Sequence, residues 1–216
     1  DMIAIEQPTV YLVDDDPAIR KGLSRLLRTA NWRVDAFASC EEFMLGHDPN
    51  APGCLLLDVM LPGLNGLELQ RRLADDGNPL PIIFLTGQGD IPMSVRAIKA
   101  GAADFLTKPV GADTLLRAVS DAIERDRETR RSRANVATIE QRLARLTPRE
   151  REVLTHVVSG KPNKTIAAEL GTVEKTVKVH RAHVMAKMRV GSFAELVRLA
   201  AQAGIGSLGP SDSVDE

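Results

Sequence analysis

Cysteines are few in this 216-residue chain, and long apolar stretches are missing. Cys40 and Cys54 lie outside any CxxC spacing and precede no histidine cluster, so we predict reduced packing residues. This pattern argues against a disulfide framework or a cysteine metal site. No stretch approaches the roughly 20 apolar residues that span a bilayer, and the first residues lack the layout of a signal peptide. We therefore expect a cytoplasmic protein with no membrane association.

Charge is distributed unevenly along the chain, although the net charge is only −1. Residues 1–122 carry 17 acidic and 11 basic side chains, residues 123–146 carry 4 and 7, and residues 147–206 carry 5 and 10. The apolar content of 44% is a globular value, which argues against wholesale disorder. An acidic first part and a basic second part indicate two domains, of which the second faces a polyanion.

Short apolar runs alternate with helix-like segments through the first domain, which we place at residues 1–122. Strands are predicted at 9–13, 33–37, 54–58, 82–86 and 104–107. Helices are predicted at 17–29, from a capping box at Ser39, and near 67–76, 92–100 and 112–122. Five strands with interleaved helices indicate a flavodoxin-like α/β fold with a doubly wound, five-stranded parallel sheet.

A charged segment, 123–146, follows the first domain. Residues 124–133 hold eight charges in ten positions, and Asp126 with Arg130 has the i,i+4 spacing that supports a helix. Val136, Ile139, Leu143 and Leu146 then recur at three- and four-residue spacings. We predict a helical linker, with a disordered basic tether as the alternative.

Only helix patterns follow, in a small all-α domain that we place at residues 147–206. Thr147 has the properties of an N-cap and Pro148 of a first helical residue. Four helices are predicted, near 148–159, 163–170, 174–189 and 192–203, with Gly160, Gly171 and Gly191 as helix stops. The tail at 207–216 is rich in glycine, serine and acid, and we expect it to fray.

Polar side chains stand where the predicted strands of the first domain end. Asp14 and Asp15 follow the first strand, Asp58 ends the third, Thr86 ends the fourth, and Lys108 follows the fifth. The carboxyl edge of an open parallel sheet is where ligands bind. Carboxylates suit a hard divalent metal, and an ammonium with a hydroxyl suits phosphoryl oxygens. Each residue alone could be a loop cap or a core residue, but together they predict a metal and phosphoryl site.

These residues resemble the receiver domain of bacterial two-component response regulators. The resemblance covers residues 9–122 and rests on Asp14-Asp15, Asp58 with Leu61-Pro62-Gly63, Thr86-Gly87 and Lys108-Pro109. It implies that Asp58 accepts a phosphoryl group from a sensor histidine kinase. It implies Mg²⁺, with Mn²⁺ as an alternative, held by Asp14, Asp15, Asp58 and the backbone carbonyl of Met60.

The same resemblance gives roles to the residues around Asp58. Lys108 and Thr86 would contact phosphoryl oxygens, and Gly87 would leave the approach to Asp58 open. Phe105 would change rotamer as Thr86 moves. A cis peptide bond is implied between Lys108 and Pro109.

A second resemblance begins at Leu146. It rests on the segments 146–154, 163–167, 176–180 and 187–188, which are similar to the four-helix DNA-binding domain of the LuxR class. The whole chain resembles a FixJ/NarL-type transcription regulator. A helix-turn-helix is implied, with a recognition helix over 173–187, and Val177, Val184 and Met188 are predicted to face the core.

Candidate DNA contacts follow from that helix in a major groove. Lys178, with Val179 and Arg181, is predicted to read bases. The predicted phosphate contacts are Asn163, Lys164, Lys175, Thr176 and Lys187. Any one lysine could instead be a solvated helix residue. His180 is predicted to be free to face DNA, but we expect at least one of His180 and His183 to be a packing residue.

Dimerisation contacts are predicted in both domains. In the first domain the candidates are Val95, Lys99 and residues near Leu115. In the last helix they are Phe193, Leu196, Leu199 and Ala200, some of which must be core.

The leading hypothesis is a transcription regulator, most simply an activator, that dimerises on phosphorylation and acts with promoter DNA and RNA polymerase. It would be no enzyme beyond phosphoryl transfer to, and hydrolysis from, its own aspartate. One rival is a phosphohydrolase with Asp58 as nucleophile, but Met60 stands where a haloacid-dehalogenase-like enzyme has its acid. The other rival is a constitutive DNA-binding protein whose receiver is only an interaction module.

Overall fold

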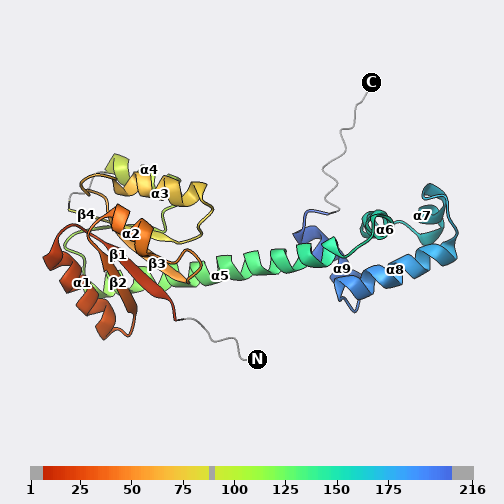
Figure 1. The fold of residues 1–216 in the computed structure, drawn as a ribbon, viewed down its shortest axis with the longest axis horizontal. Helices are drawn as coiled ribbons and strands as arrows, with labels where there is room; N and C mark the ends of the chain where they lie inside the picture. Colours follow the sequence, from red (N-terminus) through yellow and green to blue (C-terminus); the bar gives the residue numbers. More distant parts are fainter. Residues whose placement is uncertain (1–6, 88–90, 206–216) are drawn as a thin grey trace, which may run out of the picture. The chain divides into compact units, whose positions relative to one another are not determined.

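The computed structural model describes residues 7–87 and 91–205, which form two compact units divided between Arg131 and Ser132. Residues 1–131 are called unit 1 and residues 132–216 unit 2. The predicted fraying tail at 207–216 lies outside the described residues. Figure 1 shows the sheet of unit 1 and the helices of unit 2.

Unit 1 is built on a five-stranded parallel sheet, as predicted. Its strands are β1 (Thr9–Val13), β2 (Arg33–Phe37), β3 (Gly53–Asp58), β4 (Ile82–Thr86) and β5 (Asp104–Thr107). Their order in the sheet is β2-β1-β3-β4-β5, and every neighbouring pair is parallel. Strands β1, β3 and β4 are buried on both faces, which explains their continuous apolar runs.

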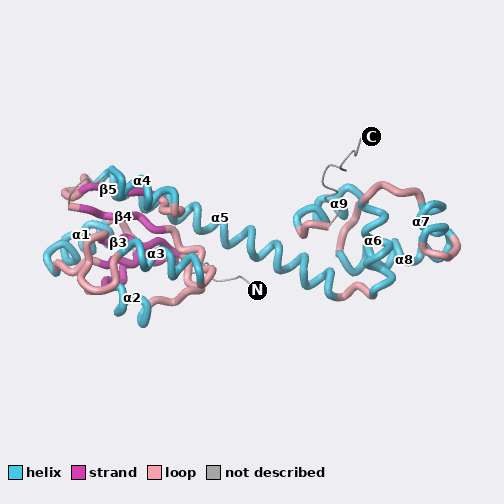
Figure 2. The backbone as a smooth tube through the Cα atoms, turned by 90° about the horizontal axis from the view of Figure 1, so that it is seen from above, coloured by secondary structure: helices cyan, strands magenta, loops and turns pink. Residues whose placement is uncertain are grey.

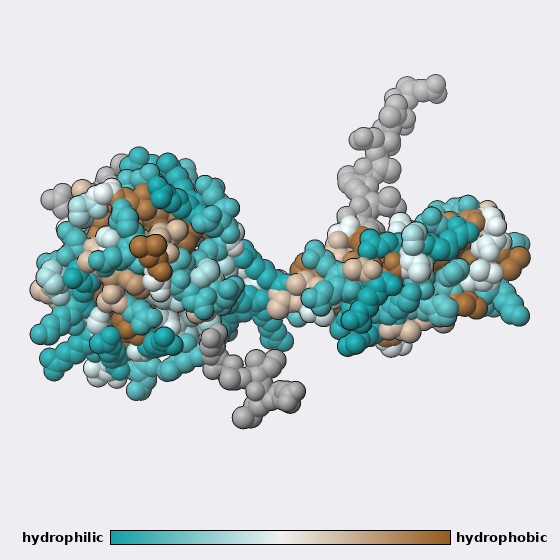
Figure 3. Space-filling model, viewed as in Figure 1, coloured by the Kyte–Doolittle hydropathy of each residue, from teal (hydrophilic) through white to brown (hydrophobic). Residues whose placement is uncertain are grey.

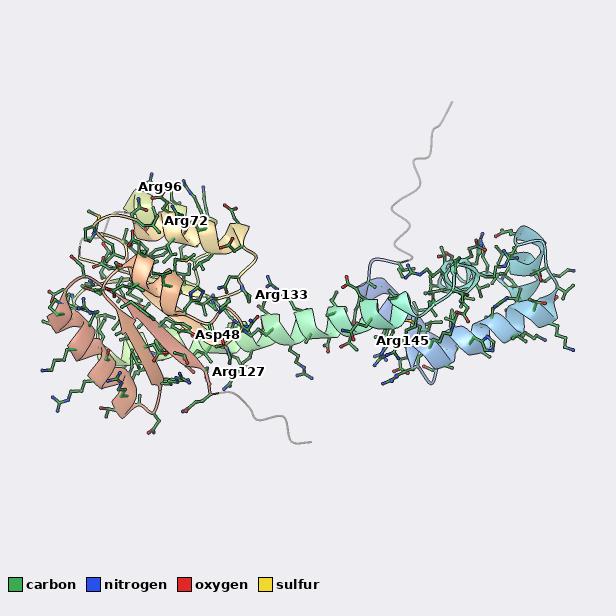
Figure 4. The ribbon with its side chains drawn as sticks, in the orientation of Figure 1. Asp48, Arg72, Arg96, Arg127, Arg133 and Arg145 are labelled. Carbon is green, nitrogen blue, oxygen red and sulfur yellow. The ribbon has the colours of Figure 1, made fainter. Side chains whose placement is uncertain are left out.

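Helices cover both faces of the sheet (Figures 1 and 2). Phe43, Leu69 and Ala97 anchor α2 (Cys40–Gly46), α3 (Gly66–Asp75) and α4 (Ile91–Lys99) in the core on one face. Leu27 and Leu115 anchor α1 (Pro17–Thr29) and α5 (Ala112–Ala144) on the other. Charged residues of these helices point away from the sheet, such as Arg72 on α3 and Arg96 on α4 (Figure 4).

The charged segment after residue 122 is helical, as predicted, because α5 continues unbroken for 33 residues. The structure contradicts the disordered tether, and it groups the first part of this segment, up to Arg131, with unit 1. Asp126 is fully buried within unit 1. Its carboxylate accepts hydrogen bonds from the Gly53 backbone N–H at 2.9 Å and from Arg130 Nε at 2.8 Å. Residues 123–131 therefore belong to unit 1.

Gly53 is required where Asp126 meets the sheet. A Cβ atom there would lie 2.0 Å from the Thr9 carbonyl oxygen of the neighbouring strand. Arg130 completes the contact, since its Nη1 donates to the Asn50 carbonyl at 2.8 Å. The sequence shows Asp126 and Arg130 as a helical pair, but only the fold reveals their partners 73 and 80 residues away.

Unit 2 contains the end of α5 and the helices α6 (Pro148–Val158), α7 (Asn163–Glu169), α8 (Glu174–Met188) and α9 (Phe193–Gln202). The predicted core positions Val177, Val184 and Met188 are buried. Ile139 and Leu143 of α5 belong to the same core. The small domain therefore begins before the predicted residue 147, because part of the supposed linker supplies apolar packing.

Helix ends in unit 2 follow the predicted chemistry with one exception. Thr147 and Glu150 form a reciprocal capping box, and Pro148 occupies the first turn. Gly160 and Gly171 adopt positive φ angles of 77° and 62° at helix ends. Gly191 was expected to stop α8, but Arg189 takes the left-handed conformation instead, with φ 55°. The prediction at Gly191 is therefore wrong, because α8 ends at Met188.

The predicted capping box at Ser39 is only half formed. Its hydroxyl accepts from the Glu42 backbone N–H at 3.2 Å. The Glu42 side chain bonds instead to the Ala38 N–H at 2.8 Å, one residue before the cap. Asp16 caps α1, with its carboxylate accepting from the Ala18 N–H at 2.7 Å.

Candidate phosphoryl-acceptor site and nucleic-acid interface

The parallel sheet brings the predicted site residues of unit 1 to one edge. Asp14 directly follows β1, Asp58 ends β3, and Thr86 ends β4. These strands are neighbours in the sheet, and Lys108 follows β5 beside them. Asp14, Asp58 and Thr86 are buried, whereas Asp15 is exposed. The edge therefore combines two sheltered carboxylates with an opening to solvent.

Lys108 links the two buried aspartates. Its Nζ lies 2.5 Å from Asp14 Oδ2 and 2.6 Å from Asp58 Oδ2. Burial lowers the pKa of Lys108, but its hydrogen bonds and Coulombic attraction to both carboxylates outweigh burial and raise the pKa overall. The ammonium is therefore charged at neutral pH and partly offsets the charge of the aspartates.

Backbone donors hold the second oxygen of each aspartate. Asp58 Oδ1 accepts from the Met60 N–H at 2.9 Å, and Asp14 Oδ1 accepts from the Asp16 N–H at 2.9 Å. The Asp14 carbonyl accepts from Arg20 Nη1 at 2.6 Å. Because both carboxylates are fixed in this way, the site is ordered by its own loops.

Carboxylate oxygens of Asp14, Asp15 and Asp58 lie within 4.8 Å of one another. Three carboxylates around one ammonium leave an excess of negative charge. Their donor set consists of oxygen only, which suits a hard cation such as Mg²⁺. The residues present therefore fit the metal that the sequence predicts. The backbone carbonyl of Met60 stays a predicted ligand.

The predicted switch residues lie around this group. Thr86 is buried at the end of β4, and a Cβ atom at Gly87 would meet no described atom within 4 Å. Phe105 is half-buried on β5, with its ring centroid 6.2 Å from that of Phe84. The peptide bond between Lys108 and Pro109 is cis, as predicted. The rotamer change of Phe105 stays a prediction.

In unit 2 only part of the predicted DNA-binding set faces solvent freely. Lys164, Lys175, Lys178 and Val179 are exposed, and Thr176 is half-buried. Arg181 was expected to face DNA, but its Nη1 donates to Asn163 Oδ1 at 2.7 Å. The Arg181 guanidinium also lies 5.9 Å from the Phe193 ring centroid. Arg181 and Asn163 therefore bind each other in this structure, and their contacts with DNA stay a prediction.

Lys187 was also expected to contact phosphate. In the structure its Nζ lies 2.6 Å from Glu150 Oε2. Glu150 is buried, and the hydrogen bond from Lys187 is the main reason that its pKa is lowered. The ammonium therefore joins α8 to α6. His180 is half-buried, consistent with a packing residue, whereas His183 has a side chain 59% exposed.

The predicted dimer contacts divide by burial. Val95 and Lys99 on α4 are exposed, and Figure 3 shows apolar surface on unit 1. Leu115 and Leu196 are at most 1% exposed and Ala200 is fully buried, so each fills the core of its own unit. Leu196 and Ala200 are therefore among the candidates of the last helix that are core, as expected for some of them, and dimer contacts near Leu115 stay a prediction. Leu199 packs against the core of unit 2 and is half-buried, while Phe193 is exposed.

Comparison with protein families assigns both units. Residues 10–120 match the response regulator receiver domain, and residues 144–200 match the bacterial regulatory proteins of the luxR family. The chain is a LuxR-class response regulator. It is therefore a transcription regulator controlled by phosphorylation, whose partners are a sensor kinase and DNA.

Relatives match this response regulator along most of its length. Nodulation protein W of Bradyrhizobium diazoefficiens is 47% identical, over 91% of this chain and 86% of that protein. Transcriptional regulatory protein FixJ of the same organism is 41% identical, over 91% of this chain and 96% of that protein. Response regulator protein TodT of Pseudomonas putida is 43% identical, over 88% of this chain and 84% of that protein.

Solved structures agree with the fold of the response regulator. The response regulator StyR is 44% identical, with a TM-score of 0.82 over 91% of this chain and 99% of that one. Full-length FixJ from B. japonicum is 40% identical, with a TM-score of 0.55 over 92% of this chain and 98% of that one. In the part of the chain that the structure describes, none of the helices is sufficiently long and apolar to cross a bilayer.

Proposed function

We propose that Asp58 is the phosphoryl acceptor of this response regulator. One Asp58 carboxylate oxygen would attack the phosphorus of a phosphohistidine, and the bond between phosphorus and nitrogen would break with its electron pair left on the imidazole. The observation that carries this proposal is Lys108 Nζ at 2.6 Å from Asp58 Oδ2. That ammonium stands where it can bind an oxygen of the transferred group.

Asp14, Asp15, Asp58 and the Met60 carbonyl would hold Mg²⁺, with Mn²⁺ as an alternative. A bound divalent ion shields the charge between a carboxylate nucleophile and an anionic donor. Asp14 contributes by placing its second oxygen beside Lys108, at 2.5 Å. Phosphorylation would make Lys108 exchange an aspartate partner for a phosphoryl oxygen. The same site would release the group by hydrolysis.

Thr86 and Phe105 would carry the change away from Asp58. A phosphoryl oxygen would accept from the Thr86 hydroxyl, drawing β4 toward the site, while Gly87 leaves room for the incoming group. Phe105 would then turn into the space beside Phe84. The exposed side chains of Val95 and Lys99 on α4 are the proposed receiver contacts of a phosphorylated homodimer.

Unit 2 would bind double-stranded promoter DNA through α8. Lys178 and Val179 are exposed on this helix and would read bases, while Lys164, Lys175 and Thr176 would bind phosphates. Asn163, Arg181 and Lys187 stay candidate DNA contacts, and the bond between Asn163 and Arg181 also joins α7 to α8. On DNA the regulator would recruit RNA polymerase as an activator in the cytoplasm. A dimer makes the second half-site intramolecular, which tightens binding without new base contacts.

Intact mass spectrometry with Mg²⁺ and acetyl phosphate tests the acceptor. Wild type should gain one phosphoryl group, and Asp58→Asn should gain none. Asp48→Asn, a change at an exposed aspartate, is the matched control and should be labelled as wild type. Stoichiometric labelling of folded Asp58→Asn would refute the assignment.

Fluorescence anisotropy with promoter DNA separates a switched regulator from a constitutive DNA-binding protein. Acetyl phosphate should tighten binding by wild type and leave Asp58→Asn unchanged. Equal affinity of phosphorylated and unphosphorylated wild type would favour the constitutive reading. Lys178→Ala should weaken binding, whereas Lys161→Ala should not, because Lys161 pairs with Glu169 at 2.7 Å.

A further inference from the structure

A second group of metal-ligating side chains lies in unit 2, far in sequence from the aspartates. One ligand atom each from Glu150, His180 and His183 lies within 4.8 Å of the others. Glu150 is on α6, and the two histidines are on α8. Because the histidines are three residues apart, they project from neighbouring positions on one side of the helix. The group therefore joins α6 to α8.

The two oxygens of Glu150 have different surroundings. Oε2 accepts from the Thr147 N–H at 2.8 Å and from Lys187 Nζ at 2.6 Å. Oε1 lies 3.6 Å from His183 Nδ1, which is too long for a hydrogen bond. The bonds to Oε2 fix the carboxylate. Oε1 therefore faces the His183 imidazole, and a ligand bound to Oε1 would not displace Lys187 from Oε2.

His180 supplies an independent indication of a missing partner. Its Nδ1 is buried and has no hydrogen-bond partner among the described residues. A buried polar atom without a partner costs free energy. A metal ion or a water molecule would remove that cost, and the nearby Glu150 and His183 favour the metal. His183 is accessible for entry of an ion, since its side chain is 59% exposed.

The donor set selects a class of ion. Two imidazole nitrogens and one carboxylate oxygen are ligands that Zn²⁺ and other late first-row divalent ions accept, whereas Mg²⁺ prefers oxygen alone. Three protein ligands leave a fourth position for water. We propose that Glu150, His180 and His183 form a Zn²⁺-class metal site that clamps α6 to α8. Occupancy would stabilise unit 2 and leave the aspartate site of unit 1 to Mg²⁺.

Calorimetry with Zn²⁺ on the full chain, in excess Mg²⁺, tests this site. Wild type should bind Zn²⁺ at one site, and Co²⁺ should give visible absorption that Zn²⁺ abolishes. His183→Ala and His180→Ala should each weaken binding at least about tenfold. Far-UV circular dichroism checks that the variants fold, and the exposed His183 is the safer change.

His156→Ala is the matched control, because His156 faces another carboxylate of unit 2, Glu169 Oε2, at 3.1 Å. It should bind Zn²⁺ as wild type does. Zn²⁺ should also raise the melting temperature of wild type and not of His183→Ala. The proposal is overturned if wild type binds no Zn²⁺ or if His183→Ala binds it equally well. If Asp58→Asn alone lost Zn²⁺ binding, the ion would belong to unit 1, and the proposal would also be overturned.

Discussion

The two units each place a lysine against a buried carboxylate, but the charge balance differs. In unit 1, Lys108 is shared by Asp14 and Asp58, with Asp15 close by. In unit 2, Lys187 pairs with a single carboxylate among the described residues, that of Glu150, and the Thr147 N–H binds the same oxygen. The first arrangement has unbalanced negative charge that a cation can relieve. In the second, one lysine balances one carboxylate, so Lys187 acts in structure, and a cation beside Oε1 would be held by the imidazoles of His180 and His183 and not by excess negative charge.

Unit 1 also contains a fully buried carboxylate whose charge is balanced by one cation, Asp126 beside Arg130. Asp126→Ala should destabilise unit 1 by about 3 kcal/mol, because it leaves Arg130 and the Gly53 N–H without their partner. Urea unfolding followed by fluorescence of Trp32, the single tryptophan, reports on this unit. Asp121→Ala, an exposed change on the same helix, should have little effect. Equal stability of the two variants would contradict the role assigned to Asp126.

Lys108→Ala would break the shared pair and should cost unit 1 about 2 kcal/mol, since two buried carboxylates then repel each other. Mg²⁺ should recover much of this loss by replacing the missing positive charge. Trp32 fluorescence during urea unfolding, with and without Mg²⁺, measures both effects. Lys187→Ala is the matched variant in unit 2, followed by circular dichroism. If Mg²⁺ restored the stability of Lys187→Ala as much as that of Lys108→Ala, the two sites would not differ in charge balance as described.

The balance at Glu150 should appear as a dependence of stability on pH. The hydrogen bond from Lys187 lowers the pKa of Glu150 below its ordinary 4.5. A lowered pKa in the folded state stabilises above pH 4.5, and that contribution is lost as pH falls through the folded value. In EDTA, Glu150→Gln should therefore be about 1 kcal/mol less stable than wild type at neutral pH. Urea unfolding by circular dichroism should show this difference shrinking in acid; a constant difference would disprove the linkage.

Thr147→Ala distinguishes the contribution of the helix cap to stability from that of the Glu150 carboxylate. It removes the hydroxyl that accepts from the Glu150 N–H, but it keeps the backbone N–H that binds Oε2. We expect a loss of about 1 kcal/mol or less in unit 2, with the acid dependence unchanged. The same unfolding series measures it. A changed acid dependence would mean that the cap also orients Glu150.

The sequence by itself determined the elements and the chemistry at their ends. Short continuous apolar runs alternating with helix patterns favour parallel strands buried on both faces, and this topology brings Asp14, Asp58, Thr86 and Lys108 to one edge of the sheet. Helix periodicity and capping residues likewise placed Val177 and Val184 in the core of unit 2. These inferences worked because they depend on local spacing and on a topology with few alternatives.

Only the tertiary structure decided which polar side chains are already bound. Arg181 and Lys187 were predicted as DNA contacts, and the structure shows that each also binds a polar side chain of its own unit, Asn163 and Glu150 respectively. Asp126 has the spacing of a solvated helical pair, yet it is buried against Gly53. Partners of this kind are distant in sequence, and their pairing depends on how helices and strands approach in space. The residue type shows whether a side chain can form hydrogen bonds, but the packing of helices and strands determines which partner it binds.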